Sequence, residues 1–179
     1  MPARYRPAVP ADRFVIVDAD MLAGWRRPTS SLDQLHDAVG QLRRQEPDVG
    51  IAVVGDPALK WALPESEHDR LELDITSRSI VFAPAGTVGG HKGFISRCVE
   101  TARDRGLSPV VLSDQAIPGA PLIRVRRDMA GQWVFDLDTV VTTTAAAVAA
   151  AGTAAPTRPP FYQGRPPTMY SWRYRKNGG

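Results

Sequence analysis

Residues 79–114 have the sequence SIVFAPAGTVGGHKGFISRCVETARDRGLSPVVLSD, and this stretch decides the fold. It begins with an apolar run, continues through a glycine-rich loop into a segment with helical periodicity, and ends on a second apolar run followed by Asp114. Gly106 stands where the helix is expected to end. A strand, a loop, an amphipathic helix and a second strand in this order are typical of the crossover between two parallel strands. The stretch therefore predicts an α/β fold.

The preceding residues continue the alternation of strands and helices. Two short apolar runs, 13–18 and 50–54, resemble parallel strands that are covered on both faces. Between them, apolar residues recur at helical spacing from Leu32, and Ser30 with Asp33 resembles a capping box. The remaining expected elements are a helix over 58–77 that is interrupted at Pro64, strands at 79–83 and 109–113, and a hairpin or late edge strands at 122–126 and 132–137.

Composition divides the chain into three parts. Residues 1–12 are expected to form an arm, residues 13–141 a three-layer α/β/α domain around a mainly parallel sheet, and residues 142–179 an Ala/Pro-rich linker with a basic aromatic tail. The net charge is +3, yet residues 1–156 sum to −2, because five basic residues and no acidic residue follow. The tail therefore supplies the cationic surplus that a polyanion would meet.

Two features of the sequence set the expected cellular context. Cys98 is the only cysteine, which excludes an internal disulfide and a cysteine-based zinc cluster. No apolar run approaches the roughly 20 residues of a membrane helix, and the N-terminus lacks the apolar stretch of a secretion signal. We therefore expect a cytoplasmic protein that does not enter a membrane.

Acidic residues follow two of the expected strands. Asp18 and Asp20 stand at the end of the first strand, and Asp114 follows the strand at 109–113. Ligands of open α/β sheets bind beyond the carboxyl ends of the strands, so these carboxylates are expected to share one acidic pocket. Asp56 is interpreted as a turn residue, because it lies within Gly55-Asp56-Pro57.

Residues 13–116 resemble the NYN/PIN-like ribonucleases, particularly the Regnase-type branch. The resemblance is carried by the opening strand with Asp18 and by an ordered series of later motifs, namely Glu67, Pro84, Val88-Gly89-Gly90, Phe94-Ile95 and Val110-Val111 leading to Asp114. It implies a PIN-like domain in which carboxylates hold Mg²⁺ or Mn²⁺ and single-stranded RNA is cut. By motif, Asp18, Glu67 and Asp114 occupy acidic positions of the family, and Asp20 is a further candidate.

Three positions depart from the family pattern. Adjacent aspartates are expected just before Phe94, but the chain has His91 and Lys92, and Met21 replaces an expected asparagine. Two hypotheses follow. In the first, a metal-dependent endoribonuclease or a weakened descendant uses Asp18, Asp20, Glu67 and Asp114, with Asp18 and Asp114 on the metal and His91 and Lys92 on substrate phosphate. In the second, the ammonium of Lys92 replaces the cation, and the protein is a catalytically inactive RNA-binding or scaffold module.

The tail and the glycine-rich loop leave further alternatives. Aromatic side chains stack on bases and arginines contact phosphates, so Arg173 and Arg175 are candidates for binding RNA. Docking of the tail on a protein partner is an equal alternative. A nucleotide-binding loop is a third possibility for the segment around Lys92, although Gly93 stands where a phosphate-binding loop has a hydroxyl.

Overall fold

The structure is a computed structural model that describes residues 12–141, with side chains up to residue 137. The expected arm, apart from Asp12, and the expected linker and tail lie outside the described residues. Along the chain the elements are β1 (Arg13–Asp18), α1 (Ala19–Ala23), α2 (Leu32–Gln45), β2 (Gly50–Gly55), α3 (Leu59–Ala62), the 3₁₀ helix η1 (Glu65–Glu67), α4 (His68–Thr76), β3 (Val81–Phe82), α5 (Gly90–Asp104), β4 (Ser108–Leu112), β5 (Leu122–Arg127) and β6 (Trp133–Val141).

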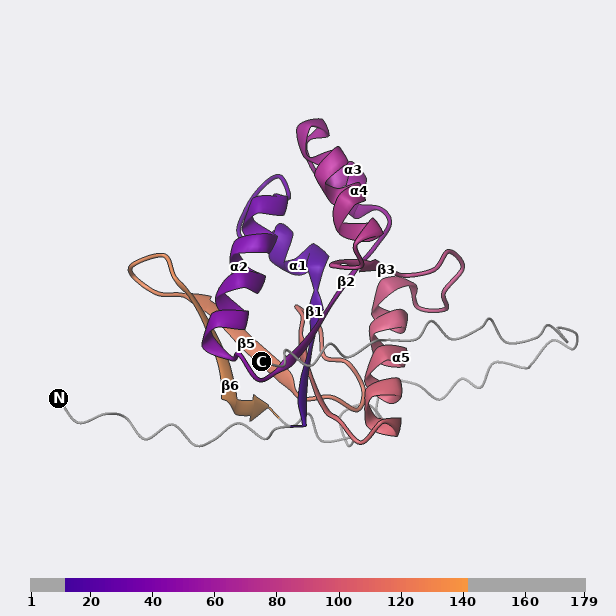
Figure 1. The fold of residues 1–179 in the computed structure, drawn as a ribbon, viewed down its shortest axis with the longest axis vertical. Helices are drawn as coiled ribbons and strands as arrows, with labels where there is room; N and C mark the ends of the chain where they lie inside the picture. The colour runs from indigo at the N-terminus through magenta and orange to yellow at the C-terminus, as the bar shows by residue number, and fades with distance from the viewer. Residues whose placement is uncertain (1–11, 142–179) are drawn as a thin grey trace, which may run out of the picture.

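The described strands form one sheet in the order β3-β2-β1-β4-β5-β6. All neighbouring strands are parallel except β5 and β6, which form the expected antiparallel hairpin. Helices α1 and α2 cover one face and α5 covers the other, as Figure 1 shows. The prediction of a three-layer α/β/α fold with a mainly parallel sheet is therefore confirmed.

Strand β1 shows why the central strands read as continuous apolar runs. Successive side chains of a strand point to opposite faces. Val15 and Val17 accordingly belong to the apolar cluster under α1 and α2, whereas Ile16 belongs to the cluster under α5. All three side chains are fully buried. A strand that is covered on both faces needs apolar side chains on both of them. The sequence of β1 is therefore a continuous apolar run instead of an alternation of apolar and polar residues.

Two of the expected local features differ in detail. The strand expected at 79–83 has only Val81 and Phe82 in the sheet, because the amides of Ser79 and Ile80 bond to the carbonyl oxygen of Asp74 at the end of α4. The N-cap of α2 is Ser31 instead of Ser30, since the Ser31 hydroxyl accepts the amide of Gln34. The expected break at Pro64 is present between α3 and η1.

Helix α4 offers a test of the packing. Leu71 is fully buried and Leu73 is 69% exposed on the same helix. We expect Leu71→Ala to lower the free energy of unfolding by about 2–5 kcal/mol, because it removes apolar contacts and leaves a cavity. The matched control Leu73→Ala should change it by less than about 0.5 kcal/mol. Urea denaturation measures both values, and equal effects would contradict the described position of α4.

Candidate functional site

The candidate site lies at the topological switch point of the sheet, between β1 and β4. From β1 the chain adds β2 and β3 on one side of the sheet, and β4 then pairs with the other side of β1. Such a reversal leaves a crevice at the carboxyl ends of the two strands. Val17 pairs with Leu112 in register, so Asp18 and Ser113 follow side by side. The expected convergence of the strand ends at Asp18 and Asp114 follows from this register.

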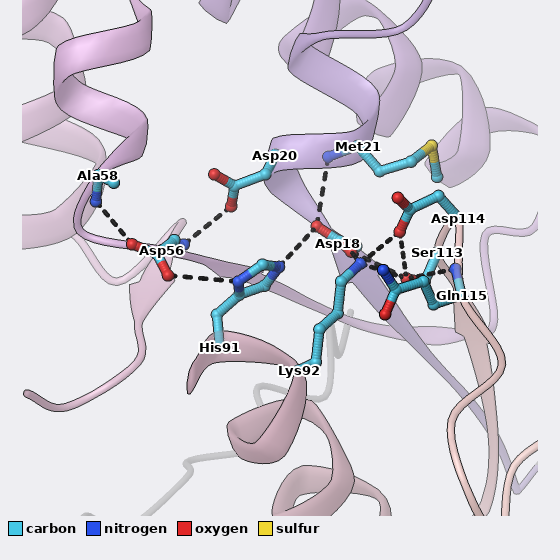
Figure 2. A network of polar contacts seen from close by, with 10 residues as sticks. All are labelled: Asp18, Asp20, Met21, Asp56, Ala58, His91, Lys92, Ser113, Asp114 and Gln115. Carbon is cyan, nitrogen blue, oxygen red and sulfur yellow. Dashed lines mark hydrogen bonds and ion pairs between the residues drawn. The ribbon is translucent and has the colours of Figure 1, made fainter. Parts of the chain in front are cut away.

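Helix α5 brings two further residues to this edge from the opposite face of the sheet. Its N-cap is Gly89, with a φ of 78°, a left-handed conformation that favours glycine. At Gly93 a Cβ would lie 2.0 Å from the carbonyl oxygen of Val88, so the loop can fold onto the helix only with glycine there. This close turn places His91 and Lys92 in the first turn of α5, facing the end of β1 (Figure 2).

The ammonium group of Lys92 joins the two strand ends. It donates hydrogen bonds to Oδ2 of Asp18 and Oδ1 of Asp114, and to Oγ of Ser113 at 2.8 Å. Figure 2 shows the side chain extending from α5 to these three groups. A lysine ammonium has three N–H donors, and this arrangement engages all three. Lys92 therefore has no donor left for a substrate phosphate while these contacts last.

The contacts change the proton affinities of both partners. Burial disfavours the charged form of Lys92, but the hydrogen bonds to Asp114 and Asp18 outweigh it and raise the pKa of the lysine. The hydrogen bond from Lys92 lowers the pKa of Asp114, which lies at the surface. Lys92 thus remains an ammonium group through the neutral range, and it can compensate negative charge permanently.

Asp18 is fully buried, and its two oxygens face different partners. Oδ2 accepts from Lys92 and, at 2.9 Å, from the hydroxyl of Ser113. Oδ1 accepts a hydrogen bond from the amide of Met21 at 3.2 Å, and this bond caps α1. The same oxygen lies 3.6 Å from Nε2 of His91. One side chain therefore both caps α1 and takes the expected place at the end of β1 beside Asp114 and Lys92.

His91 links Asp18 to a second acidic pair. Its Nδ1 lies 3.3 Å from Oδ2 of Asp56, and the amide of Asp56 donates to Oδ2 of Asp20 at 2.8 Å. Burial raises the pKa of Asp20, with further increases from the charges of Asp18 and Asp56, and the bond to the Asp56 amide and the nearby His91 oppose this rise. Asp18, Asp20 and His91 offer ligand atoms that all lie within 4.8 Å of one another.

Glu67 has a different position from the other predicted acidic residues. Its Oε2 accepts the amide of Leu32 at 2.8 Å, so the carboxylate caps the first turn of α2. It is not part of the group formed by Asp18, Asp20 and His91. Arg173 and Arg175, predicted to bind RNA, lie outside the described residues.

Ser113 and Asp56 are two site residues that sequence reasoning did not select. Ser113 donates to Asp18 and accepts from Lys92, and its signal in the sequence was a hydroxyl directly before Asp114 at a strand end. Asp56 is the expected turn residue, since its Oδ1 accepts the amide of Ala58, but it also contacts His91. The prediction of a turn therefore explains the contact of Oδ1 but not the contact of Oδ2 with His91.

A divalent cation does not fit between Asp18 and Asp114 in this arrangement. Mg²⁺ requires oxygen ligands at about 2.0–2.1 Å in octahedral geometry. The ammonium of Lys92 is hydrogen-bonded to both carboxylates and to Ser113 between them. The position that the family resemblance assigns to metal is therefore taken by an internal cation.

Comparisons with models of protein families, with curated proteins and with solved structures found no match to the chain. Among the described residues, none of the helices combines the length and the apolar character needed to cross a membrane.

Replacing the internal cation tests its structural role. We expect Lys92→Met to lower the free energy of unfolding by about 3–5 kcal/mol, because it leaves the buried charge of Asp18 without its main partner. Combined with Asp18→Asn, the same change should cost far less, since no buried charge remains. A double-mutant cycle in urea measures the coupling between the two residues. Additive effects of the two substitutions would contradict the pairing.

The lowered pKa of Asp114 predicts how stability depends on pH. A carboxyl group with a folded-state pKa below its unfolded value of about 3.9 contributes stability above that pH and loses it as the pH falls through the folded value. Wild type should therefore exceed Asp114→Asn by a constant margin above about pH 5, and the margin should shrink below about pH 4. Because Asp114 is exposed, the margin should stay below about 1 kcal/mol. Denaturation midpoints at several pH values check this.

Proposed function

We propose that the protein is an RNA-directed module of the PIN-like/NYN type in which Lys92 replaces the divalent cation, so that it binds RNA without hydrolysing it. One observation carries the proposal: the Lys92 ammonium donates to Asp18, Ser113 and Asp114 at the carboxyl ends of β1 and β4. The α/β/α fold and the ordered motifs of residues 13–116 support the PIN-like part.

Charge explains why this arrangement favours binding over hydrolysis. Phosphodiester hydrolysis by this class of enzyme relies on a cation that offsets phosphoryl charge and activates water. Asp18 and Asp114 together carry a charge of −2, and the ammonium of Lys92 brings the sum for the three groups to −1. A divalent ion about 4 Å from the ammonium would be repelled by roughly 4 kcal/mol for each of its charges at an effective dielectric constant of 20. The attraction left at this pair is too weak to hold Mg²⁺ there.

The RNA-directed part of the proposal relies on the sequence beyond the domain. Arg173 and Arg175 alternate with Trp172 and Tyr174, a composition suited to single-stranded RNA through stacking and phosphate contacts. Residues 1–156 carry a net charge of −2, so the long-range attraction to a polyanion comes mainly from the residues that follow. Electrostatic attraction to RNA is therefore assigned to the tail.

The metal-dependent endoribonuclease remains the competing hypothesis. It requires Asp18 and Asp114 to exchange Lys92 for a metal ion, and it assigns Glu67 to the reaction although that carboxylate caps α2. Both hypotheses predict RNA binding, but only the endoribonuclease predicts cleavage that depends on Mg²⁺ or Mn²⁺.

An RNA-binding and cleavage assay separates these hypotheses. We expect labelled unstructured RNA to bind equally in EDTA and in millimolar Mg²⁺, as measured by fluorescence anisotropy, and to stay intact on a denaturing gel. Replacing Arg173 and Arg175 by alanine should weaken binding and reduce the slope of log affinity against log salt by roughly 0.7 for each phosphate that is no longer neutralised.

Two results would contradict the proposal. Cleavage that requires Mg²⁺ or Mn²⁺ and is lost in Asp114→Asn would establish the endoribonuclease instead. Absence of RNA binding would favour a scaffold role. Asp114 is suited to this control because its side chain is largely exposed, so its replacement is expected to leave the fold intact.

A further inference from the structure

One ring nitrogen of His91 has no hydrogen-bond partner within the part of the chain that the structure describes. Its Nδ1 faces Oδ2 of Asp56 at 3.3 Å, while its Nε2 is buried and has no hydrogen-bond partner among the described residues. The nearest anionic atom to Nε2, Oδ1 of Asp18, lies 3.6 Å away, which is beyond a hydrogen bond. Buried polar atoms are normally partnered, so a nitrogen without a protein partner beside a carboxylate is available to a ligand.

The groups around Nε2 are those that bind a metal ion. Asp18 from the end of β1, Asp20 from the first turn of α1 and His91 from the first turn of α5 offer ligand atoms within 4.8 Å of one another. Around an ion bound at about 2.1 Å, neighbouring ligand atoms are roughly 3.0–3.4 Å apart. The ligand atoms would therefore have to move closer together than they lie now. Small side-chain rotations, chiefly of the half-buried Asp20, would bring them to this spacing.

Asp56 provides the support that metal-binding histidines usually have. A ligating imidazole generally donates its other N–H to a carboxylate or carbonyl group, which fixes the tautomer and the ring orientation. The carboxylate of Asp56 lies 3.3 Å from Nδ1 of His91, close enough for this role after a small rotation of the ring, and it is itself oriented by the amide of Ala58 (Figure 2). In the tautomer that Asp56 favours, Nε2 carries the lone pair that a metal ion needs.

We propose that Asp18, Asp20 and His91 form a site for a divalent transition-metal ion, with Nε2 of His91 as the nitrogen ligand and Asp56 as its orienting group. The site goes beyond the proposed function. It uses the side of Asp18 opposite Lys92, and it does not depend on RNA. A set of one imidazole and two carboxylates suits Zn²⁺ or Mn²⁺, whereas Mg²⁺ favours oxygen ligands and retains its water.

Solvent can reach the histidine. A pocket of about 200 Å³ is lined by Asp56, His91 and residues of the loop before α5. The pocket therefore reaches the Asp56 side of the imidazole, and an ion entering it would still have to pass the ring to reach Asp18 and the buried Nε2. The three ligands leave further coordination positions for water or for a bound oxygen anion.

Metal titrations of the full chain test the proposal. We expect Zn²⁺ and Mn²⁺ to raise the melting temperature and to bind, by calorimetry, at least about tenfold more tightly than Mg²⁺. His91→Gln and Asp20→Asn should each lower Zn²⁺ and Mn²⁺ affinity by more than about tenfold, and Asp56→Asn by about 10- to 100-fold. His68→Gln is the matched control, because His68 lies on α4 and contacts the carbonyl of Leu63.

Pulsed electron paramagnetic resonance of the Mn²⁺-loaded chain identifies the ligand directly. The chain has three histidines, so a nitrogen coupling that is lost in His91→Gln and retained in His68→Gln assigns it to His91. Urea denaturation without metal establishes that the variants are folded. The proposal is overturned if folded wild type binds neither ion, if His91→Gln binds as well as wild type, or if the nitrogen coupling is absent. RNA binding in EDTA is measured separately, so failure of this site leaves the proposed function intact.

Discussion

The ion pair between Lys92 and Asp18 is the interaction on which the arrangement of the site depends. Asp18 is fully buried at the end of the central strand, and a buried carboxylate is costly unless opposite charge and hydrogen bonds compensate it. Lys92 supplies the charge, and Ser113 and the amide of Met21 supply further hydrogen bonds. The same ammonium contacts Asp114, so one cation joins β1, β4 and α5 at the crevice of the sheet.

Helix α5 begins against its own local preference to make this contact. The positive end of a helix dipole disfavours cations in the first turn, yet Lys92 stands there, with no acidic residue in that turn and no side-chain cap. Gly89 and Gly93 provide the backbone geometry for this start. Local preferences are commonly overridden at functional sites, so the position of Lys92 is explained by the carboxylates opposite it and not by the helix.

The sequence was sufficient for most of the fold and for part of the site. Continuous apolar runs predicted β1 and β4, because strands covered on both faces leave that pattern. Their parallel register then brought Asp18 and Asp114 to one crevice. Three features depended on atomic positions that residue spacing does not contain: the amides that shorten β3, the direction of the Glu67 carboxylate toward α2, and the contacts of Ser113 and Asp56. The sequence was enough to select Lys92 and His91 as candidate residues, but it did not determine which groups each side chain contacts.

The two oxygens of Asp18 divide the candidate site into unequal halves. Oδ2 accepts hydrogen bonds from Lys92 and Ser113, so its negative charge is compensated without any ligand. Oδ1 has only the amide of Met21 as a close donor among the described residues, and the imidazole beside it is too distant for a hydrogen bond. The histidine and lysine in the first turn of α5 therefore have two separate consequences. The lysine compensates the charge of one half, whereas the histidine offers a nitrogen atom beside the other. The proposed metal site accordingly needs only the carboxylate oxygen of Asp18 that Lys92 does not contact.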